Sequence, residues 1–332
     1  MRMSGTRPRV AFVGLGWIGR HRMEGILDLV EPVALADPFP EGREEAAALC
    51  PGAQVFETLE EALATKPDGV VIATPSAMHA EQSVAALTAG CAVFCQKPLG
   101  RSAVEVQGVV DAARASNRLL HVDLSYRGTS ALRAIHAAVQ RGDIGKVFAV
   151  DLVFHNAYGP GKPWFYDKAQ SGGGPLMDLG VHLIDSALWC LNFPQMTCTT
   201  AEIYGKGAPG LSPDAVEDYA SATLRTEDGT ALRLACSWNL HAGREAVIEV
   251  HLHGTEGGLS LTNPGGDFYD FEARLHRGTT SERIAAPPDP WGIAMIRDWA
   301  TRLGQDASFD PAAERYVDLA RVIDDIYTKG AR

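Results

Sequence analysis

A carboxylate and an imidazole lie four residues apart in the segment Gly172–His182, which reads GGGPLMDLGVH. On a helix, Asp178 and His182 would share one face, one turn apart. A carboxylate beside an imidazole is a common arrangement for a general base near neutral pH. A glycine loop that leads into an ordinary amphipathic helix has the same pattern, so this segment alone leaves both interpretations open. We expect Pro175 to begin the helix and the three glycines to let a ligand approach the backbone.

A second chemical signature lies near the N-terminus, where GLGWIG matches G-x-G-x-x-G and begins at Gly14, the last residue of the apolar run 9–14. Between a strand and a helix, such glycines permit a tight turn, close approach of a pyrophosphate and close packing of the helix. Backbone N–H groups at the helix start bind the phosphates. The cofactor-binding residues expected here are Gly14, Gly16, Trp17, Ile18 and Gly19.

Asp37 ends the next predicted strand, 18 residues after Gly19. A carboxylate at this position accepts hydrogen bonds from ribose hydroxyls and repels a 2′-phosphate, so NAD is favoured over NADP. Arg20 and Arg43 leave a contact with a 2′-phosphate open. The alternative is a turn aspartate without a ligand, and the agreement of glycines, strand order and spacing argues against it.

Two more polar segments follow predicted strands. Ala73 and Thr74 end the run 68–74 and Pro75 follows it, while Gln96 and Lys97 follow the run 91–95. In a parallel sheet, loops at the carboxyl ends of the strands line the ligand crevice. Lys97 is therefore interpreted as an ammonium beside the reacting oxygen, with a solvated lysine at a strand end as the alternative.

Strands and helices alternate through the first third of the chain. Apolar runs predict strands at 9–14, 32–37, 53–57, 68–74, 91–95 and 118–123, with helical segments between them. This alternation indicates right-handed βαβ units and a doubly wound parallel sheet. We assign residues 1–125 to a dinucleotide-binding Rossmann domain.

Residues 126–332 have a different pattern: a helix at 131–145, a β-rich run at 146–156 and the helix after the three glycines come first, and several β-rich segments then follow without helices between them. They predict an α+β domain with a mostly antiparallel sheet, finished by helices near 291–303 and 311–328. In TALRLACSW, one alternation contains Leu232, Leu234, Cys236 and Trp238 and suits packing on helices. The other is small and semi-polar, which suits solvent or a subunit contact.

Composition restricts the class of protein. The chain has 332 residues and a net charge of -11, which argues against nucleic acid or an anionic membrane as a partner. Its six cysteines fit no zinc or disulfide framework, so we expect buried free thiols, a reducing compartment and no metal. Without an apolar signal core or a membrane-length apolar run, a cytoplasmic enzyme is the expectation.

The order and spacing of GLGWIG, Asp37, ATPSAMH, Lys97-Pro98 and GGGPLMDLGVH resemble one family. This is the glucose–fructose oxidoreductase / inositol dehydrogenase / rhizopine-catabolism (Gfo/Idh/MocA) family of NAD(P)-dependent oxidoreductases. The resemblance implies a Rossmann domain, a second domain with a large open sheet, and a site between them. It also implies hydride transfer at a sugar or cyclitol carbon, and a homodimer or homotetramer formed through the open sheet.

The family's functional residues carry over by position. Lys97 matches the lysine of its Glu-Lys-Pro motif, and Asp178 and His182 match its aspartate and histidine. The resemblance further assigns the cofactor loop and helix start to Thr74, Pro75 and His79, and a common family arginine to Arg127. Gln96 departs from the family because it replaces the glutamate, which removes a charge beside Lys97.

The substrate wall is expected among aromatic and histidine side chains near these motifs. Aromatic faces suit the apolar faces of a sugar, although simple packing explains them equally well. The candidates in these stretches are Tyr126, His155, Tyr158, Trp164 and Tyr166. The predicted substrate-binding set is Lys97, Arg127, His155, Trp164, Asp178 and His182.

These residues favour an NAD-dependent dehydrogenase in which His182 takes a hydroxyl proton, Asp178 orients it and Lys97 stabilises the alkoxide. Three alternatives remain open. They are a glycosidase that oxidises its substrate transiently with bound NAD, a reductase of a non-sugar ring, and a non-catalytic NAD-binding sensor.

Overall fold

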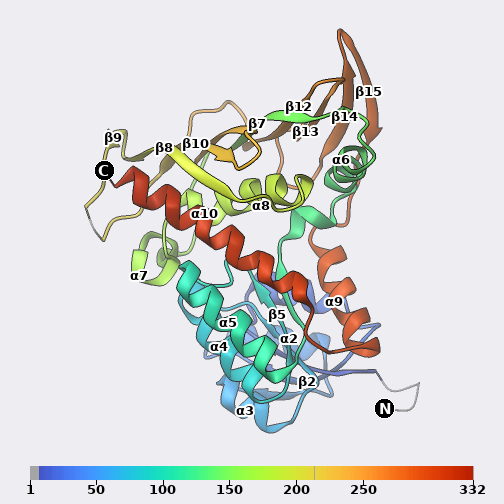
Figure 1. Cartoon of the computed structure of the whole chain (residues 1–332). Helices are drawn as coiled ribbons and strands as arrows, with labels where there is room; N and C mark the ends of the chain where they lie inside the picture. Colours follow the sequence, from blue (N-terminus) through green and yellow to red (C-terminus); the bar gives the residue numbers. More distant parts are fainter. Residues whose placement is uncertain (1–6, 213, 332) are drawn as a thin grey trace. The chain divides into compact units, whose positions relative to one another are not determined.

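The computed structural model describes residues 7–212 and 214–331 and divides into two compact units (Figure 1). The first unit contains the chain up to Gly100, Val104–Asp123 and Gly292–Val317. The second contains Arg101–Ala103, Leu124–Trp291 and the chain from Asp318 onward. The sequence predicted a single division after residue 125, whereas segment 292–317 lies in the first unit rather than the second.

The first unit is built on a six-stranded parallel sheet in the order β3-β2-β1-β4-β5-β6. Its strands are β1 (Arg9–Val13), β2 (Glu31–Ala36), β3 (Gln54–Phe56), β4 (Gly69–Ile72), β5 (Ala92–Gln96) and β6 (Leu120–Asp123). The intervening helices are α1 (Trp17–Glu24), α2 (Pro40–Leu49), α3 (Leu59–Ala64), α4 (Ser76–Thr88) and α5 (Ala103–Ser116). The doubly wound prediction is confirmed, and the strand order reverses between β1 and β4, where such sheets bind ligands.

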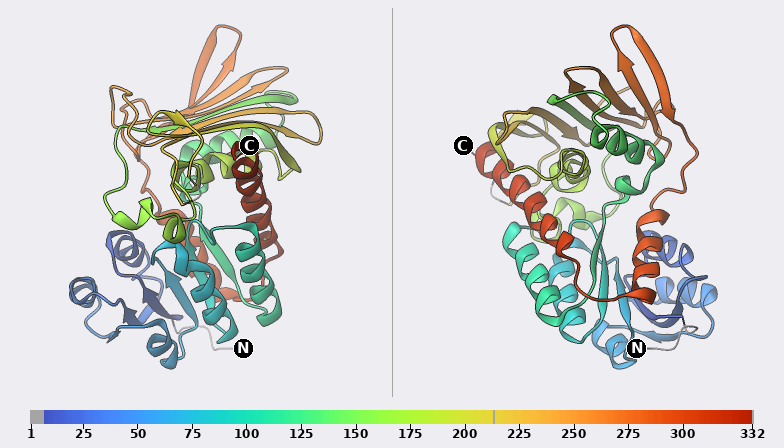
Figure 2. Two further views of the ribbon diagram at one scale, coloured as in Figure 1. Left: turned by 90° about the vertical axis from the view of Figure 1, so that its left-hand side faces the viewer. Right: turned by 45° about the vertical axis from the view of Figure 1, so that its right-hand side comes forward.

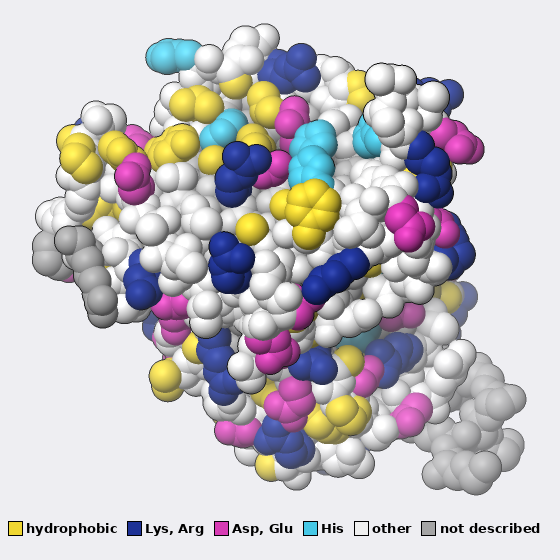
Figure 3. All heavy atoms as spheres, turned by 45° about the horizontal axis from the view of Figure 1, so that its top comes forward, with side chains coloured by type: hydrophobic (Ala, Val, Ile, Leu, Met, Phe, Trp, Pro, Cys, Tyr) yellow, Lys and Arg dark blue, Asp and Glu magenta, His cyan; other side chains and the backbone are white. Residues whose placement is uncertain are grey.

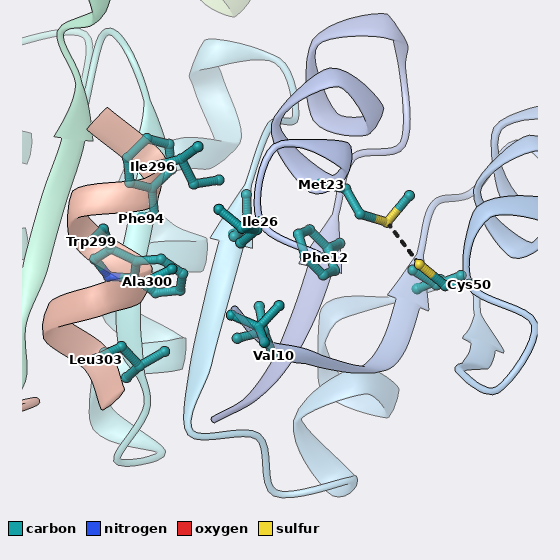
Figure 4. Packing of buried hydrophobic residues seen from close by; sticks show 14 of the residues in the cluster. Val10, Phe12, Met23, Ile26, Cys50, Phe94, Ile296, Trp299, Ala300 and Leu303 are labelled. Atoms are coloured by element: carbon teal, nitrogen blue, oxygen red, sulfur yellow. Dashed lines mark hydrogen bonds between the residues drawn. The ribbon is translucent and has the colours of Figure 1, made fainter. Parts of the chain in front are cut away.

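A helix from the end of the chain completes the core of this unit. In α9 (Ile293–Gln305), the side chains of Ile296, Trp299 and Leu303 pack in one cluster with residues of β1 and β5 (Figure 4). A Cβ at Gly69 would lie 2.8 Å from the Trp299 ring, so glycine makes room for the indole. Burial of these large apolar side chains explains why segment 292–317 belongs with the first unit.

The second unit contains a nine-stranded sheet in the order β15-β14-β13-β12-β7-β11-β10-β8-β9. Its strands are β7 (Val147–Asn156), β8 (Met196–Gly205), β9 (Ala208–Pro209), β10 (Tyr219–Thr226), β11 (Ala231–Ser237), β12 (Ala246–Gly254), β13 (Gly258–Thr262), β14 (Glu272–Arg277) and β15 (Thr280–Ala285). All neighbouring pairs are antiparallel except β7 and β11. The predicted large, mostly antiparallel sheet is confirmed.

Helices α6 (Ser130–Gln140) and α8 (Val181–Cys190) pack on one face of this sheet (Figure 2). The remaining helical segments are η1 (Ser125–Gly128), η2 (Pro163–Tyr166), α7 (Lys168–Ser171), η3 (Leu176–Gly180), η4 (Pro311–Glu314) and α10 (Arg315–Gly330). On β7, Val150, Leu152 and Phe154 are buried, and the residues between them point to the other face.

The other face of the nine-stranded sheet is mixed in character. Asp151 pairs there with Arg233 at 2.6 Å and with His253 at 3.0 Å. Figure 3 shows basic, acidic, histidine and hydrophobic side chains side by side over this sheet. Arg233 belongs to the alternation of TALRLACSW that the sequence assigned to solvent or a subunit contact.

The six cysteines are free and buried, as the sequence predicted. Burial raises the pKa of the Cys95 and Cys190 thiols to about 12, so both stay protonated near neutral pH. None of the helices in the described part of the chain is long and apolar enough to cross a membrane.

Candidate active site

The glycine loop between β1 and α1 has the geometry that its sequence predicts. Gly14 has a φ of +85°, a conformation that favours glycine, and its N–H donates to the Ala36 carbonyl at 2.9 Å. A Cβ at Gly14 would lie 2.5 Å from the Ala73 backbone, and one at Gly19 would overlap the Gly14 carbonyl oxygen. The loop is therefore packed against its own backbone and the end of β4.

Asp37 connects the end of β2 to this loop. It is 9% exposed, and its carboxylate accepts the Leu15 N–H at 2.7 Å and the Phe39 N–H at 2.9 Å. Both nearby guanidinium groups have acidic partners, because Arg43 pairs with Glu57 at 3.3 Å and Arg20 pairs with Glu45 at 2.6 Å. Asp37 thus holds the loop and presents negative charge beside it.

These residues fit a dinucleotide. Helix α1 begins at Trp17, directly after Gly16, so the N–H groups of its first turn lack helical acceptors and can bind phosphate. The Trp17 side chain is 58% exposed and stacks on His21. Ile18 lies in the same first turn.

His79, at the start of α4, joins two loops at the carboxyl edge of the sheet. The ring is buried, with Nε2 2.7 Å from the Thr74 carbonyl oxygen and Nδ1 2.6 Å from that of Pro98. Burial is the main cause that lowers the pKa of His79, although these carbonyls oppose it. Pro75 directly precedes α4, and the two His79 contacts hold the loop 73–75 and the loop that carries Lys97 to this helix.

Gln96 and Lys97 end β5. The Gln96 side chain is buried and donates to the Asp123 carboxylate, which also pairs with the buried Arg22 at 2.6 Å. Lys97 is partly buried and lies between Gln96 and Pro98, both of which have contacts with buried side chains. The lysine is thus anchored on both sides along the chain.

In the second unit, the segment with Asp178 and His182 is not one continuous α-helix as expected. Asp178 lies in the π-helical turn η3, whereas His182 lies in the first turn of α8, and Pro175 precedes the π turn. Single π turns inside helices are rare and often occur at functional sites. The wider turn changes the one-turn relation that the spacing predicted.

Aromatic side chains hold both groups. The Trp238 indole N–H donates to the Asp178 carboxylate at 3.2 Å. The His182 ring is 7% exposed and stacks on Tyr126, with ring centroids 4.6 Å apart and planes 20° from parallel. Burial, and then the nearby Asp178 charge, raise the pKa of Tyr126 well above its ordinary value, so the phenol stays neutral.

The glycines before this segment make room for the protein itself. A Cβ at Gly173 would overlap the Tyr327 hydroxyl, and one at Gly174 would overlap the Glu217 carbonyl oxygen. The buried Glu217 carboxylate accepts the N–H groups of Gly174 and Leu176 at 3.0 Å each, and the Tyr327 hydroxyl at 2.8 Å. Gly173 and Gly174 are therefore needed for packing within the protein itself, and the expectation that these glycines also admit a ligand stays a prediction.

Three other predicted substrate residues have different surroundings. Arg127 makes a two-pronged ion pair with the buried Asp185 of α8, one bond of which is 2.8 Å. His155 bonds to Ser237 at 2.8 Å on the sheet face opposite Phe154, away from Tyr126 and His182. Trp164 is partly exposed and stacks on Phe165 with centroids 3.8 Å apart.

Sequence reasoning missed Glu217, Tyr327 and the role of Trp238. Trp238 directly follows β11 and is buried, as the alternation of Leu232, Leu234, Cys236 and Trp238 predicts, and this alternation was the available signal. The alternation on β7 could also have separated His155 from Phe154. Glu217 and Tyr327 lie too far along the chain from Gly174 for a local pattern to connect them.

Known proteins share both the sequence and the fold. Residues 8–124 match the oxidoreductase family with an NAD-binding Rossmann fold, and residues 132–260 match the GFO/IDH/MocA C-terminal domain. D-glucoside 3-dehydrogenase of Escherichia coli (strain K12) is 29% identical over 210 residues, which span 60% of this chain and 60% of that protein. Other curated relatives are named levoglucosan dehydrogenase and inositol 2-dehydrogenase.

Two solved structures extend the similarity over nearly the whole chain. A protein from gentamicin A biosynthesis in complex with NAD is 25% identical, with a TM-score of 0.81 over 99% of this chain and 96% of that one. A 3-ketoreductase from Actinomadura kijaniata in complex with NADP and TDP-benzene has the same fold, with 20% identity and a TM-score of 0.83 over 98% of each chain. With both domain matches in the expected order, the chain belongs to the Gfo/Idh/MocA family of oxidoreductases.

Proposed function

We propose that this protein is an NAD-dependent oxidoreductase that acts on a secondary hydroxyl, or the corresponding ketone, of a sugar, sugar derivative or cyclitol. One observation carries the proposal: a chain of this family contains both a close-packed glycine loop that suits a dinucleotide and the side chains of Lys97, Asp178 and His182. A pure binding protein needs no proton relay, so this set favours an enzyme over a sensor.

The proposed mechanism assigns one task to each side chain. Bound nicotinamide supplies the acceptor or donor of hydride. His182 takes the hydroxyl proton, and Asp178, oriented by the Trp238 N–H, orients the imidazole. Lys97 stabilises the negative charge that develops on the same oxygen. Reduction of a ketone uses these groups in reverse.

NAD is proposed over NADP because Asp37 places a carboxylate at the end of β2. The relatives do not decide this point, since one neighbouring structure contains NAD and another NADP. The engagement of Arg20 and Arg43 with glutamates further disfavours a 2′-phosphate. NADP turnover equal to that with NAD would contradict this preference.

The substrate residues are proposed in two groups. Lys97 and His182 contact the reacting hydroxyl, with Asp178 beside them to orient the imidazole and meet a neighbouring hydroxyl, and Trp164 offers an aromatic face to the rest of the ring. Arg127 and His155 are not retained, because the first is paired with Asp185 and the second lies on the opposite sheet face.

A panel of sugars, inositols, sugar acids and lactones with NAD or NADP tests the proposal through absorbance of the reduced nicotinamide. Stoichiometric accumulation of NADH with product is the expected result. Release of an alcohol from a glycoside without net NADH would instead indicate a glycosidase with transient oxidation. Tight NADH binding without turnover of any member would indicate a sensor.

Two further expectations are proposals about the protein in solution. The face of the nine-stranded sheet that carries Asp151 and Arg233 is proposed as the contact in a homodimer or homotetramer. Sedimentation velocity measures the oligomeric state and so tests whether such an assembly forms. The free, buried cysteines suit a reducing compartment, so a cytoplasmic location is proposed.

A further inference from the structure

A buried polar network lies directly beside the proposed catalytic lysine. Arg22 and Asp123 are each 1% exposed, and Arg22 Nε donates to Asp123 Oδ2 at 2.6 Å. The Gln96 amide donates to the same oxygen. Burial of an ion pair is costly and stabilises a fold only weakly, so its position invites a functional explanation.

The three residues come from elements that meet the cofactor loops. Arg22 lies on α1, the helix whose first-turn N–H groups can bind phosphate. Gln96 and Asp123 are the last residues of β5 and β6, and they are paired in register. A Cβ at Gly292 would overlap the Arg22 guanidinium, so the chain reserves space for this side chain.

The network also explains why glutamine replaces the family's glutamate at position 96. Asp123 already supplies a buried carboxylate that meets Arg22. A glutamate at position 96 would place a second carboxylate beside Asp123 Oδ2. The two negative charges would repel each other strongly in this buried environment of low dielectric. Glutamine instead donates a hydrogen bond to Asp123 Oδ2.

We propose that Gln96, Asp123 and Arg22 are positioning residues that fix Lys97 relative to helix α1, with Asp123 supplying the buried carboxylate of the network. His79 completes the arrangement by holding Pro98 on the other side of Lys97. Lys97 therefore moves little relative to the phosphate-binding turn. The catalytic part of this inference rests on the function proposed above.

A charge-exchange cycle tests the network. The variants are Gln96→Glu, Asp123→Asn and the double variant, with Leu303→Ala as a control that removes buried volume from the same core without touching the network. Gln96→Met removes the amide donor without adding charge, and it serves if Gln96→Glu does not fold. Each protein is assayed for kcat, KM, NADH affinity by fluorescence and thermal midpoint.

We expect both charge-changing single variants to lose kcat about 10- to 100-fold, because misplacement of a catalytic group by an ångström has such effects. The double variant should recover most of the loss, since one carboxylate again faces Arg22. Leu303→Ala should lower the thermal midpoint and leave kcat within about twofold at a temperature where it is folded.

Two results would overturn the proposal. In the first, the double variant is no better than the worse single variant in kcat and NADH affinity. In the second, the single variants behave like Leu303→Ala, with a lower thermal midpoint and unchanged kcat and NADH affinity. If the wild-type protein turns over no sugar or cyclitol, the proposed function fails, but the NADH affinities of the wild type, the two charge-changing single variants, the double variant and Leu303→Ala still decide whether the network positions the residues that bind the cofactor.

Discussion

The two glycine-rich segments of this chain are shaped by different kinds of neighbour. Gly14 and Gly19 pack against the backbone of their own loop and of Ala73 at the end of β4. Gly173 and Gly174 pack against Tyr327 and Glu217, which come from α10 and from the segment before β10. The first segment packs mainly on backbone atoms, and the second also packs on the polar side chains of Tyr327 and Glu217.

This difference indicates how each unit supports its chemistry. In the first unit, glycines bring main-chain N–H groups to a helix start, and the ligand completes the site. In the second unit, the N–H groups of Gly174 and Leu176 donate to the buried carboxylate of Glu217 instead of to a ligand. Glu217 thus fixes the start of the segment that carries Asp178 and His182.

Gly174→Ala should have the largest effect on stability among the changes that test this comparison. Its Cβ would overlap a backbone carbonyl oxygen, which cannot rotate away, so we expect a loss of about 3 kcal/mol. Urea unfolding followed by intrinsic fluorescence measures it. Gly108→Ala in α5 is the matched control, because a Cβ there meets nothing within 4 Å and should be neutral or stabilising by up to about 1 kcal/mol. Equal midpoints for the two variants would refute the close packing.

Glu217→Gln should have the next largest effect. The amide keeps one acceptor oxygen but turns N–H donors toward backbone N–H groups, which we expect to cost about 1–3 kcal/mol and to lower kcat about tenfold or more. Tyr327→Phe removes a single donor and should cost about 1 kcal/mol. NADH affinity, measured by fluorescence, should not change in either variant. A selective loss of NADH affinity would contradict the division of tasks.

His79→Gln should have the smallest effect, visible in the pH dependence of stability. Burial holds the pKa of His79 below the ordinary 6.5, so the unfolded chain binds a proton that the folded chain resists. The resulting stability is complete above pH 6.5 and is lost as pH falls, with a slope of at most about 1.4 kcal/mol per pH unit. As the pH is lowered from about 7.5 to about 5, the thermal midpoint of the wild type should therefore fall more steeply than that of His79→Gln. Parallel slopes would show that His79 does not titrate differently on folding.

The same contrast explains what the sequence could predict. The glycine loop, Asp37 and the alternating strands form contiguous patterns whose geometry follows from backbone sterics and burial, and the structure has the predicted parallel sheet. The place of α9 in the first core could not be predicted, because Trp299 and Gly69 are 230 residues apart and packing alone connects them.

The candidate site in the second unit was predicted by residue type more than by geometry. Asp178 and His182 were found from their spacing and family resemblance, but the π turn that contains Asp178 depends on tertiary contacts that no helical period encodes. The contacts of Arg127 with Asp185 and of Trp238 with Asp178 join residues 58 and 60 positions apart. Such pairs become visible only when the sheet and its helices are assembled.

The central claim is that Lys97 and His182 act on one hydroxyl in one chemical step. Single-turnover rates of NADH formation for Lys97→Met, His182→Ala and the double variant, on the substrate that the panel identifies, test it most directly. We predict that each single variant loses about 10²- to 10⁴-fold in rate with unchanged NADH affinity, and that the double variant loses little more than the worse single one. Losses that multiply in the double variant, or a near wild-type rate in either single variant, would contradict the claim.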